Sequence, residues 1–96
     1  MTTERLKELF DDNEDFLKFE RVKNKYCQRA DLHAFILLNK ICPGNKDIID
    51  GADHEIVFLG VDIDKLAENI TEERVDELSM CGVFFSNEFN CLAMFV

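Results

Sequence analysis

The chain has 96 residues, of which 47% are hydrophobic and 32% are charged, and its formal net charge is −9. This length excludes a second independently folded unit, and the apolar content, which includes nine phenylalanines, excludes a disordered chain. We therefore expect a single acidic domain over residues 1–96.

The N-terminal half of the sequence predicts three helices. Thr3 places a capping hydroxyl before apolar residues at positions 6, 9 and 10, which predicts a helix over residues 4–11. Apolar side chains at positions 16, 19, 22 and 26 indicate a second helix. Asp31 can cap a third helix, Leu32 to Cys42, which the following Pro-Gly pair ends.

The C-terminal half predicts a strand, two helices and a β-hairpin. Residues 45–54 are loop-like, with one Ile-Ile pair that fits a short strand or a turn. Residues 56–61 are apolar on both alternating faces, which is typical of a central strand. Asp62 and Thr71 can each cap a helix, and Gly82 ends the second one. Residues 83–96 then supply the hairpin.

These elements predict an α+β fold with a small, mainly antiparallel sheet packed with helices. Both strands of the hairpin are apolar on both faces, so each side of the sheet has to be covered by helices of the chain or by a second subunit. A chain this short buries a smaller fraction of its surface than a long chain does. A homodimer would therefore be a natural supplement to its stability.

The sequence predicts a cytoplasmic protein with reduced cysteines. No window reaches the roughly 18 consecutive apolar residues of a membrane span, and the first five residues lack the apolar core of a signal peptide. The cysteines form no Cys-x-x-Cys pair and have mostly apolar neighbours, which favours four buried thiols over two disulfides. They are Cys27, Cys42, Cys81 and Cys91.

Four segments follow a recognisable pattern of core and turn residues. They are Asp31–Leu38, Pro43-Gly44, Gly82-Val83 and Leu92–Val96. This pattern resembles small acidic proteins of unassigned function that tailed bacteriophages and prophages encode. The resemblance covers most of the chain and implies a bacterial cytoplasm as the setting, but it transfers no functional residue because it includes no catalytic motif.

The sequence predicts no catalytic residue, no cofactor and no metal. His33 lies on an apolar helix, where a hydrogen-bonded core imidazole is expected, and the glycines form no phosphate-binding loop. The alternative is a small metal-assisted enzyme that uses Asp50, Asp53, His54 and Glu55, since oxygen and imidazole ligands suit Mg²⁺, Mn²⁺ or Zn²⁺. The same residue types are also ordinary turn residues.

Charge is divided unevenly between the two halves of the chain. Residues 1–46 have a net charge of +1 and residues 47–96 a net charge of −10. The segment from Lys18 to Arg29 has five basic residues and two aromatic ones, a composition that can contact a nucleic-acid backbone and its bases. The net charge of −9 opposes such binding, so we expect this segment to balance the acidic half of the chain instead.

Acidic residues on the last two predicted helices give the main functional hypothesis. They are Glu68, Glu72, Glu73, Asp76 and Glu77. A face of this kind can dock on a basic surface of a protein partner and, in the strongest version, imitate a DNA backbone, although a solubilising face is the simpler interpretation. We therefore expect a non-enzymatic binding or regulatory module that acts through protein contacts.

The C-terminal strand predicts self-association as a second kind of contact. Its apolar residues are Leu92, Met94, Phe95 and Val96. If this strand is an unpaired edge of the sheet, it invites pairing with another strand, and the partner would be a second copy of the chain.

Overall fold

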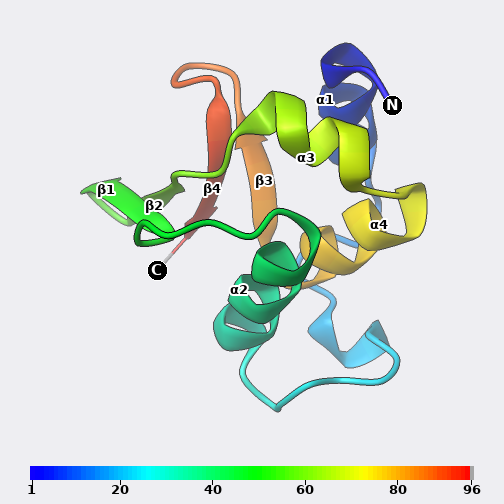
Figure 1. Cartoon of the computed structure of the whole chain (residues 1–96). Helices are drawn as coiled ribbons and strands as arrows, with labels where there is room; N and C mark the ends of the chain where they lie inside the picture. Colours follow the sequence, from blue (N-terminus) through cyan, green and yellow to red (C-terminus); the bar gives the residue numbers. More distant parts are fainter. Residues whose placement is uncertain (96) are drawn as a thin grey trace.

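The computed structural model describes residues 1–95, with helices in both halves of the chain and the sheet built from its second half (Figure 1). In these residues the elements are α1 (Thr3–Asp11), the 3-10 helix η1 (Phe19–Arg21), α2 (Ala30–Ile41), β1 (Ile49–Asp53), β2 (Ile56–Leu59), α3 (Ile63–Asn69), α4 (Glu72–Met80), β3 (Val83–Ser86) and β4 (Cys91–Phe95). The predicted fold class, a single α+β domain with an antiparallel sheet packed with helices, is confirmed.

The strands of residues 1–95 form one antiparallel sheet in the order β1-β2-β4-β3. β2 pairs with both β1 and β4, which confirms that it is a central strand. β4 pairs with β2 on one side and with β3 on the other. The prediction that the C-terminal strand is an unpaired edge is therefore wrong, because the β1–β2 hairpin occupies the side that the sequence left open.

The α-helices pack on one face of this sheet, which we term the inner face. Its side chains are Val57, Leu59, Val83, Phe85, Leu92 and Met94. Every α-helix adds leucines to the same core, including Leu6 from α1, Leu37 from α2, Leu66 from α3 and Leu78 from α4. The opposite side of the sheet, the outer face, carries the alternate residues of each strand and has none of these helices against it (Figure 1).

The ends of α1, α3 and α4 follow local capping signals. Asp62 and Thr71 accept hydrogen bonds from N–H groups in the first turns of α3 and α4, as predicted. The cap of α1 is Thr2 and not Thr3, because the Thr2 hydroxyl oxygen accepts the Arg5 N–H at 3.1 Å. Each cap satisfies an N–H group that the helix itself leaves without a partner.

The helix α2 begins earlier than its sequence signal indicates. It starts at Ala30, so Asp31 lies in the first turn, where its carboxylate accepts the Leu32 N–H at 2.9 Å. With 12 residues α2 is the longest helix of residues 1–95, and no helix in this part of the chain is long and apolar enough to cross a membrane.

Residues 12–29 do not form the second predicted helix. In this described segment only η1 is helical, and Leu17 and Asn24 adopt φ angles of 64° and 53°, which interrupt a right-handed helix. Phe16 packs against the outer face of the sheet, whereas Phe19 packs against the core on the inner side. A helix would place both rings on one side, so tertiary contacts override the helical spacing.

The sequence predicted a loop with at most a short strand where the structure forms the five-residue strand β1. Its residues include Gly51 and Asp53, which are poor strand formers, and most of them are exposed. The strand forms because its backbone pairs with β2 across a tight turn in which His54 has a φ angle of 54°. The Gly60 N–H extends this pairing by donating to the Ile48 carbonyl at 2.7 Å.

We predict that Gly82→Ala lowers the free energy of unfolding by about 1–2 kcal/mol, as measured by urea denaturation. Gly82 follows α4 with a φ angle of +98°, where an L side chain is strained, and an added Cβ would lie 2.8 Å from Leu17 Cδ2. Gly44→Ala is the control because no atom lies within 4 Å of an added Cβ there. Equal stabilities of the two variants would contradict the prediction.

Candidate functional site

Three helices, α1, α3 and α4, form a layer that polar contacts hold together. In this layer Arg5 donates to Glu72 at 3.2 Å, which links α1 to α4. The Thr3 hydroxyl donates to Asp64 at 2.7 Å, which links α1 to α3. The N-terminal ammonium adds a contact to the Ala67 carbonyl at 2.9 Å. These contacts place the side chains of α1 beside α3 and α4, the two helices that carry the predicted binding carboxylates.

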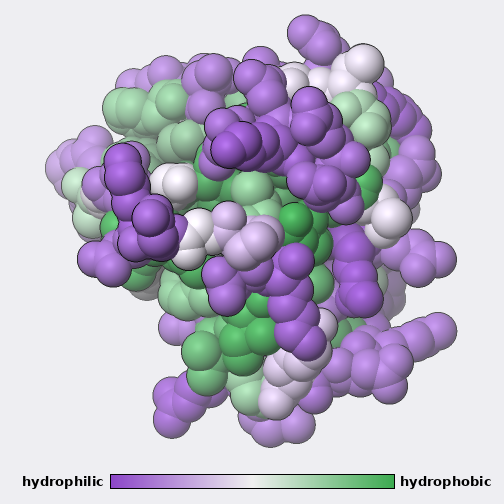
Figure 2. All heavy atoms as spheres, in the orientation of Figure 1, coloured by the Kyte–Doolittle hydropathy of each residue, from purple (hydrophilic) through white to green (hydrophobic). Residues whose placement is uncertain are grey.

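The solvent side of these three helices is strongly acidic, and we term it the acidic layer. The helices carry nine Asp and Glu residues, three in α1, two in α3 and four in α4, against four Lys and Arg residues. Eight of the nine carboxylate residues are exposed. Figure 2 shows hydrophilic residues over α3 and along the side of the molecule where α1 and α4 lie.

Three of the four cations of the acidic layer, Arg5, Lys7 and Arg74, contact neighbouring side chains. Arg5 contacts both Glu8 and Glu72, and hydrogen bonding to Glu72 is the main cause that raises the pKa of this guanidinium. Lys7 lies over the Phe85 ring, 5.1 Å from its centroid. Because these cations are engaged, the layer presents mainly carboxylates to a partner.

The predicted binding residues fall into two groups. Glu68, Glu72, Glu73 and Asp76 are exposed on the acidic layer, and Asp76 accepts a hydrogen bond from the Asn13 side chain at 2.6 Å. Glu77 differs from them, because its side chain is only 16% exposed and points toward α2. The sequence also missed the contribution of α1. Its Glu4, Glu8 and Asp11 were visible as the polar side of an amphipathic helix, but only the tertiary packing joins them to the layer.

Glu77 forms a hydrogen bond with a buried histidine. His33 of α2 is fully buried, and its Nε2 lies 2.6 Å from Glu77 Oε2. The His33 Nδ1 accepts the Tyr26 backbone N–H at 3.2 Å, so the neutral tautomer with its proton on Nε2 satisfies both contacts. Arg74 donates to the second oxygen of Glu77 at 2.7 Å.

The environment of His33 confirms the prediction of a hydrogen-bonded core imidazole. Its ring stacks on Tyr26 with centroids 4.7 Å apart and meets Phe19 edge-on at 5.7 Å. Within residues 1–95 every buried side-chain nitrogen and oxygen has a hydrogen-bond partner. Both nitrogens of His33 are occupied, so in this arrangement the ring cannot take a proton from a nucleophile.

The basic segment from Lys18 to Arg29 lies against α4. A hollow of about 560 Å³ between them is lined by Arg21 and Lys23 on one side and by Glu73 and Asp76 on the other. Any phosphate that entered this hollow would meet carboxylates as well as cations. The ion pairs that Arg21 and Lys18 form in the described residues go to Asp15, at 2.7 and 4.0 Å, so the expectation that the basic segment balances the acidic half stays a prediction.

The aromatic residues of the basic segment are also engaged within the molecule. Tyr26 is held between His33 and Lys40, whose Nζ lies 4.4 Å from the Tyr26 ring centroid. Lys25 lies over the Phe19 ring at 5.2 Å. These contacts compete with the stacking of nucleic-acid bases on the same rings.

Of the residues in the metal-site hypothesis, Asp53, His54 and Glu55 lie at the β1–β2 turn, whereas Asp50 lies in β1 beside Gly60. His54 Nε2 is 3.5 Å from Asp53 Oδ1, and these side chains are 92% and 57% exposed. Among the described residues no three Asp, Glu, His or Cys side chains are grouped so that they could hold one metal ion. The structure thus brings Asp53 and His54 together but does not assemble Asp50, His54 and Glu55 around a common point.

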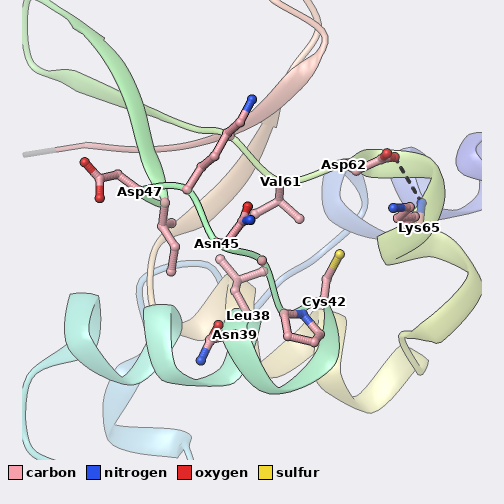
Figure 3. A pocket seen from close by; sticks show the side chains of 13 residues that line it. Leu38, Asn39, Cys42, Asn45, Asp47, Val61, Asp62 and Lys65 are labelled. Atoms are coloured by element: carbon pink, nitrogen blue, oxygen red, sulfur yellow. Dashed lines mark hydrogen bonds between the residues drawn. The ribbon is translucent and has the colours of Figure 1, made fainter.

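A pocket of about 350 Å³ lies between the end of α2, the following loop and the start of α3 (Figure 3). Figure 3 shows Cys42, Asn45 and Val61 around this space, whereas Asp47 points away from it. The Asp62 carboxylate at its border already accepts the Lys65 N–H at 3.2 Å as part of the helix cap. The pocket has the size of a small-ligand site, but its geometry defines no reaction.

The residues predicted for self-association do not share one surface. Leu92 and Met94 point to the inner face and are buried in the core. Phe95 belongs to the outer face and is 54% exposed. Val96 lies outside the described residues. Self-association therefore stays a prediction, but it cannot use a free edge of β4, because both sides of that strand are paired.

The cysteines are all free thiols, and they differ in burial. Only Cys81 is buried, while Cys27, Cys42 and Cys91 are partly exposed, so the prediction of four buried thiols is wrong for three of them. Burial, with a smaller contribution from the Glu77 carboxylate, raises the pKa of the Cys81 thiol to about 12. Burial also raises the pKa of Cys91.

The chain matches no protein-family model, and no curated protein and no solved structure is significantly similar to it. The resemblance to small phage and prophage proteins therefore stays a prediction. Functional inferences for this chain rest on its own geometry and charge.

We predict that Glu77→Ala lowers the free energy of unfolding by about 2 kcal/mol, because it leaves the buried His33 N–H without an acceptor. Glu73→Ala removes an exposed carboxylate from the same helix and should change stability by less than about 0.5 kcal/mol. Urea denaturation of both variants at neutral pH measures the difference. Indistinguishable midpoints would show that the His33–Glu77 contact contributes nothing to stability.

We predict that iodoacetamide modifies Cys81 only after unfolding. With a pKa of about 12, the Cys81 thiol is a thiolate in about one molecule in ten thousand at pH 8, and its side chain is also buried. The partly exposed Cys27 and Cys42 should react in the folded protein. Peptide mapping by mass spectrometry measures each rate, and equal rates at Cys27 and Cys81 would refute the assignment.

Proposed function

We propose that this chain is a non-enzymatic binding module whose acidic layer docks on a basic surface of a protein partner. The observation that supports this proposal is the exposure of eight of the nine carboxylate residues on α1, α3 and α4. Complementary charge of this kind speeds association and selects the partner more than it adds affinity. The resemblance to phage-encoded proteins suggests a bacterial host protein as the partner.

The arrangement of the layer also supports a protein partner over a nucleic acid. Two cations of the layer, Arg5 and Arg74, already contact carboxylates, and the hollow beside the basic segment is lined partly by Glu73 and Asp76. A phosphate backbone would be repelled by the net charge of −9. A basic protein surface, in contrast, would replace the counterions of the layer.

We predict that the triple variant Glu4→Lys, Glu68→Lys, Glu73→Lys loses a basic partner. The immobilised wild-type protein captures this partner from a bacterial lysate at low salt. Each reversal exchanges an exposed carboxylate for a cation, so three of them raise the net charge from −9 to −3. Glu77 is left unchanged because its carboxylate supports the fold. Mass spectrometry of the bound fractions identifies the partner, and raised salt should release it.

The control is the variant Glu20→Lys, Glu55→Lys, Glu88→Lys, which changes the net charge equally. These three residues are exposed and lie outside the acidic layer. The control should keep the captured protein, and circular dichroism checks that both variants are folded. Equal retention by the two variants would mean that the acidic layer does not select the partner.

A further inference from the structure

The outer face of the sheet carries a cluster of aromatic side chains that lies outside the main core. Its residues are Ile56, Phe58, Phe84, Ala93 and Phe95 on the strands, with Phe16 and Phe89 from the adjoining loops. Phe58, Ala93 and Phe84 lie opposite one another across β2, β4 and β3. This register makes the apolar strip continuous across β2, β4 and the edge strand β3.

The rings of this outer-face cluster contact one another. Phe84 stacks on Phe95 with centroids 4.9 Å apart and meets Phe16 edge-on at 6.2 Å. Phe58 and Phe89 are tilted at 4.6 Å. These contacts arrange the rings before any partner binds, so docking on them would order few additional side chains.

Much of this aromatic surface remains in water. Phe89 and Phe95 are 50% and 54% exposed. Since a phenylalanine can bury roughly 150–250 Å², these two rings alone leave about 200 Å² uncovered. An exposed apolar patch of this kind is typical of an interaction site.

We propose that the outer face packs against the same face of a second copy of this chain. A twofold axis through the sheet would bring two apolar faces together as a β-sandwich, with sheets about 10 Å apart and the helices of both subunits outside. The strands contribute no Lys, Arg or Glu to this face, and the carboxylates on it, Asp50 near Cys91 and Asp53, both lie on the edge strand β1. Such packing therefore buries rings without burying a charged group in the centre.

The distribution of charge favours a second copy of the chain as the partner of the outer face. Each subunit has a net charge of −9, so two copies repel each other wherever their carboxylates approach. The acidic layer lies on helices that cover the inner face, so face-to-face packing of the outer faces keeps the two layers at opposite ends of the dimer. Contact through the outer faces thus keeps the two acidic layers apart.

The size of the outer face indicates a weak dimer. Four strands about 4.8 Å apart and about five residues long cover roughly 300 Å² in projection, and the loops with Phe16 and Phe89 widen the contact. Stable interfaces bury about 800 Å² on each partner, so this face is smaller than a stable interface. A dissociation constant in the micromolar range is the expected consequence.

Sedimentation equilibrium of the full chain over micromolar to millimolar concentrations tests this inference. The mass of the wild type should rise from 11.2 kDa toward twice that value. Phe95→Lys should weaken the dimer about tenfold or more, since it would bury an unpaired ammonium group. Phe89→Lys, in the turn between β3 and β4, is a second variant that perturbs the sheet less and should also weaken the dimer.

Leu32→Lys is the matched control, because it replaces an exposed apolar residue on α2 and changes the net charge equally. It should leave the dimer unchanged, and added salt should not dissociate the wild type because the contact is apolar. A wild type that stays at 11.2 kDa up to millimolar concentration would overturn the proposal. Equal weakening by Leu32→Lys and both phenylalanine variants would overturn it as well.

Discussion

One-sided packing of the helices on a small sheet is the constraint on which the structure depends. The inner face is closed by leucines from every α-helix, including Leu6, Leu37, Leu66 and Leu78, and the resulting core is fully buried. A chain of this length has no further helix for the second side of the sheet in its described residues. The outer face is covered only by loop residues such as Phe16, so its aromatic side chains stay partly in water.

The same constraint separates two surfaces with different physical chemistry. The acidic layer consists of the solvent sides of helices whose apolar sides form the core. Carboxylates on these solvent sides keep their hydration in the folded protein. The outer face presents rings instead, and its contacts would be driven by burial of apolar area. Salt should therefore weaken binding at the first surface and not at the second, which allows the two proposed contacts to be studied separately.

The His33–Glu77 contact explains why one carboxylate of α4 is turned into the protein while its neighbours face solvent. It joins α2 to α4 through a 2.6 Å hydrogen bond in the interior, and Arg74 holds the other oxygen of the same carboxylate. A buried polar group with all its partners in place fixes the relative position of two helices more specifically than leucine packing does. Glu77 thus belongs to the architecture of the domain, although in sequence it belongs to the same acidic run as Glu73.

Elements with strong local signals could be predicted from the sequence alone. The caps at Asp62 and Thr71, the end of α4 at Gly82 and the central strand β2 follow from residue types a few positions apart. Tertiary contacts decided the rest, because long-range pairing can override weak local preference. They made β1 a strand through its pairing with β2, broke the helical spacing around Phe16, and gave adjacent carboxylates of α4 different roles by placing only one of them against a buried imidazole.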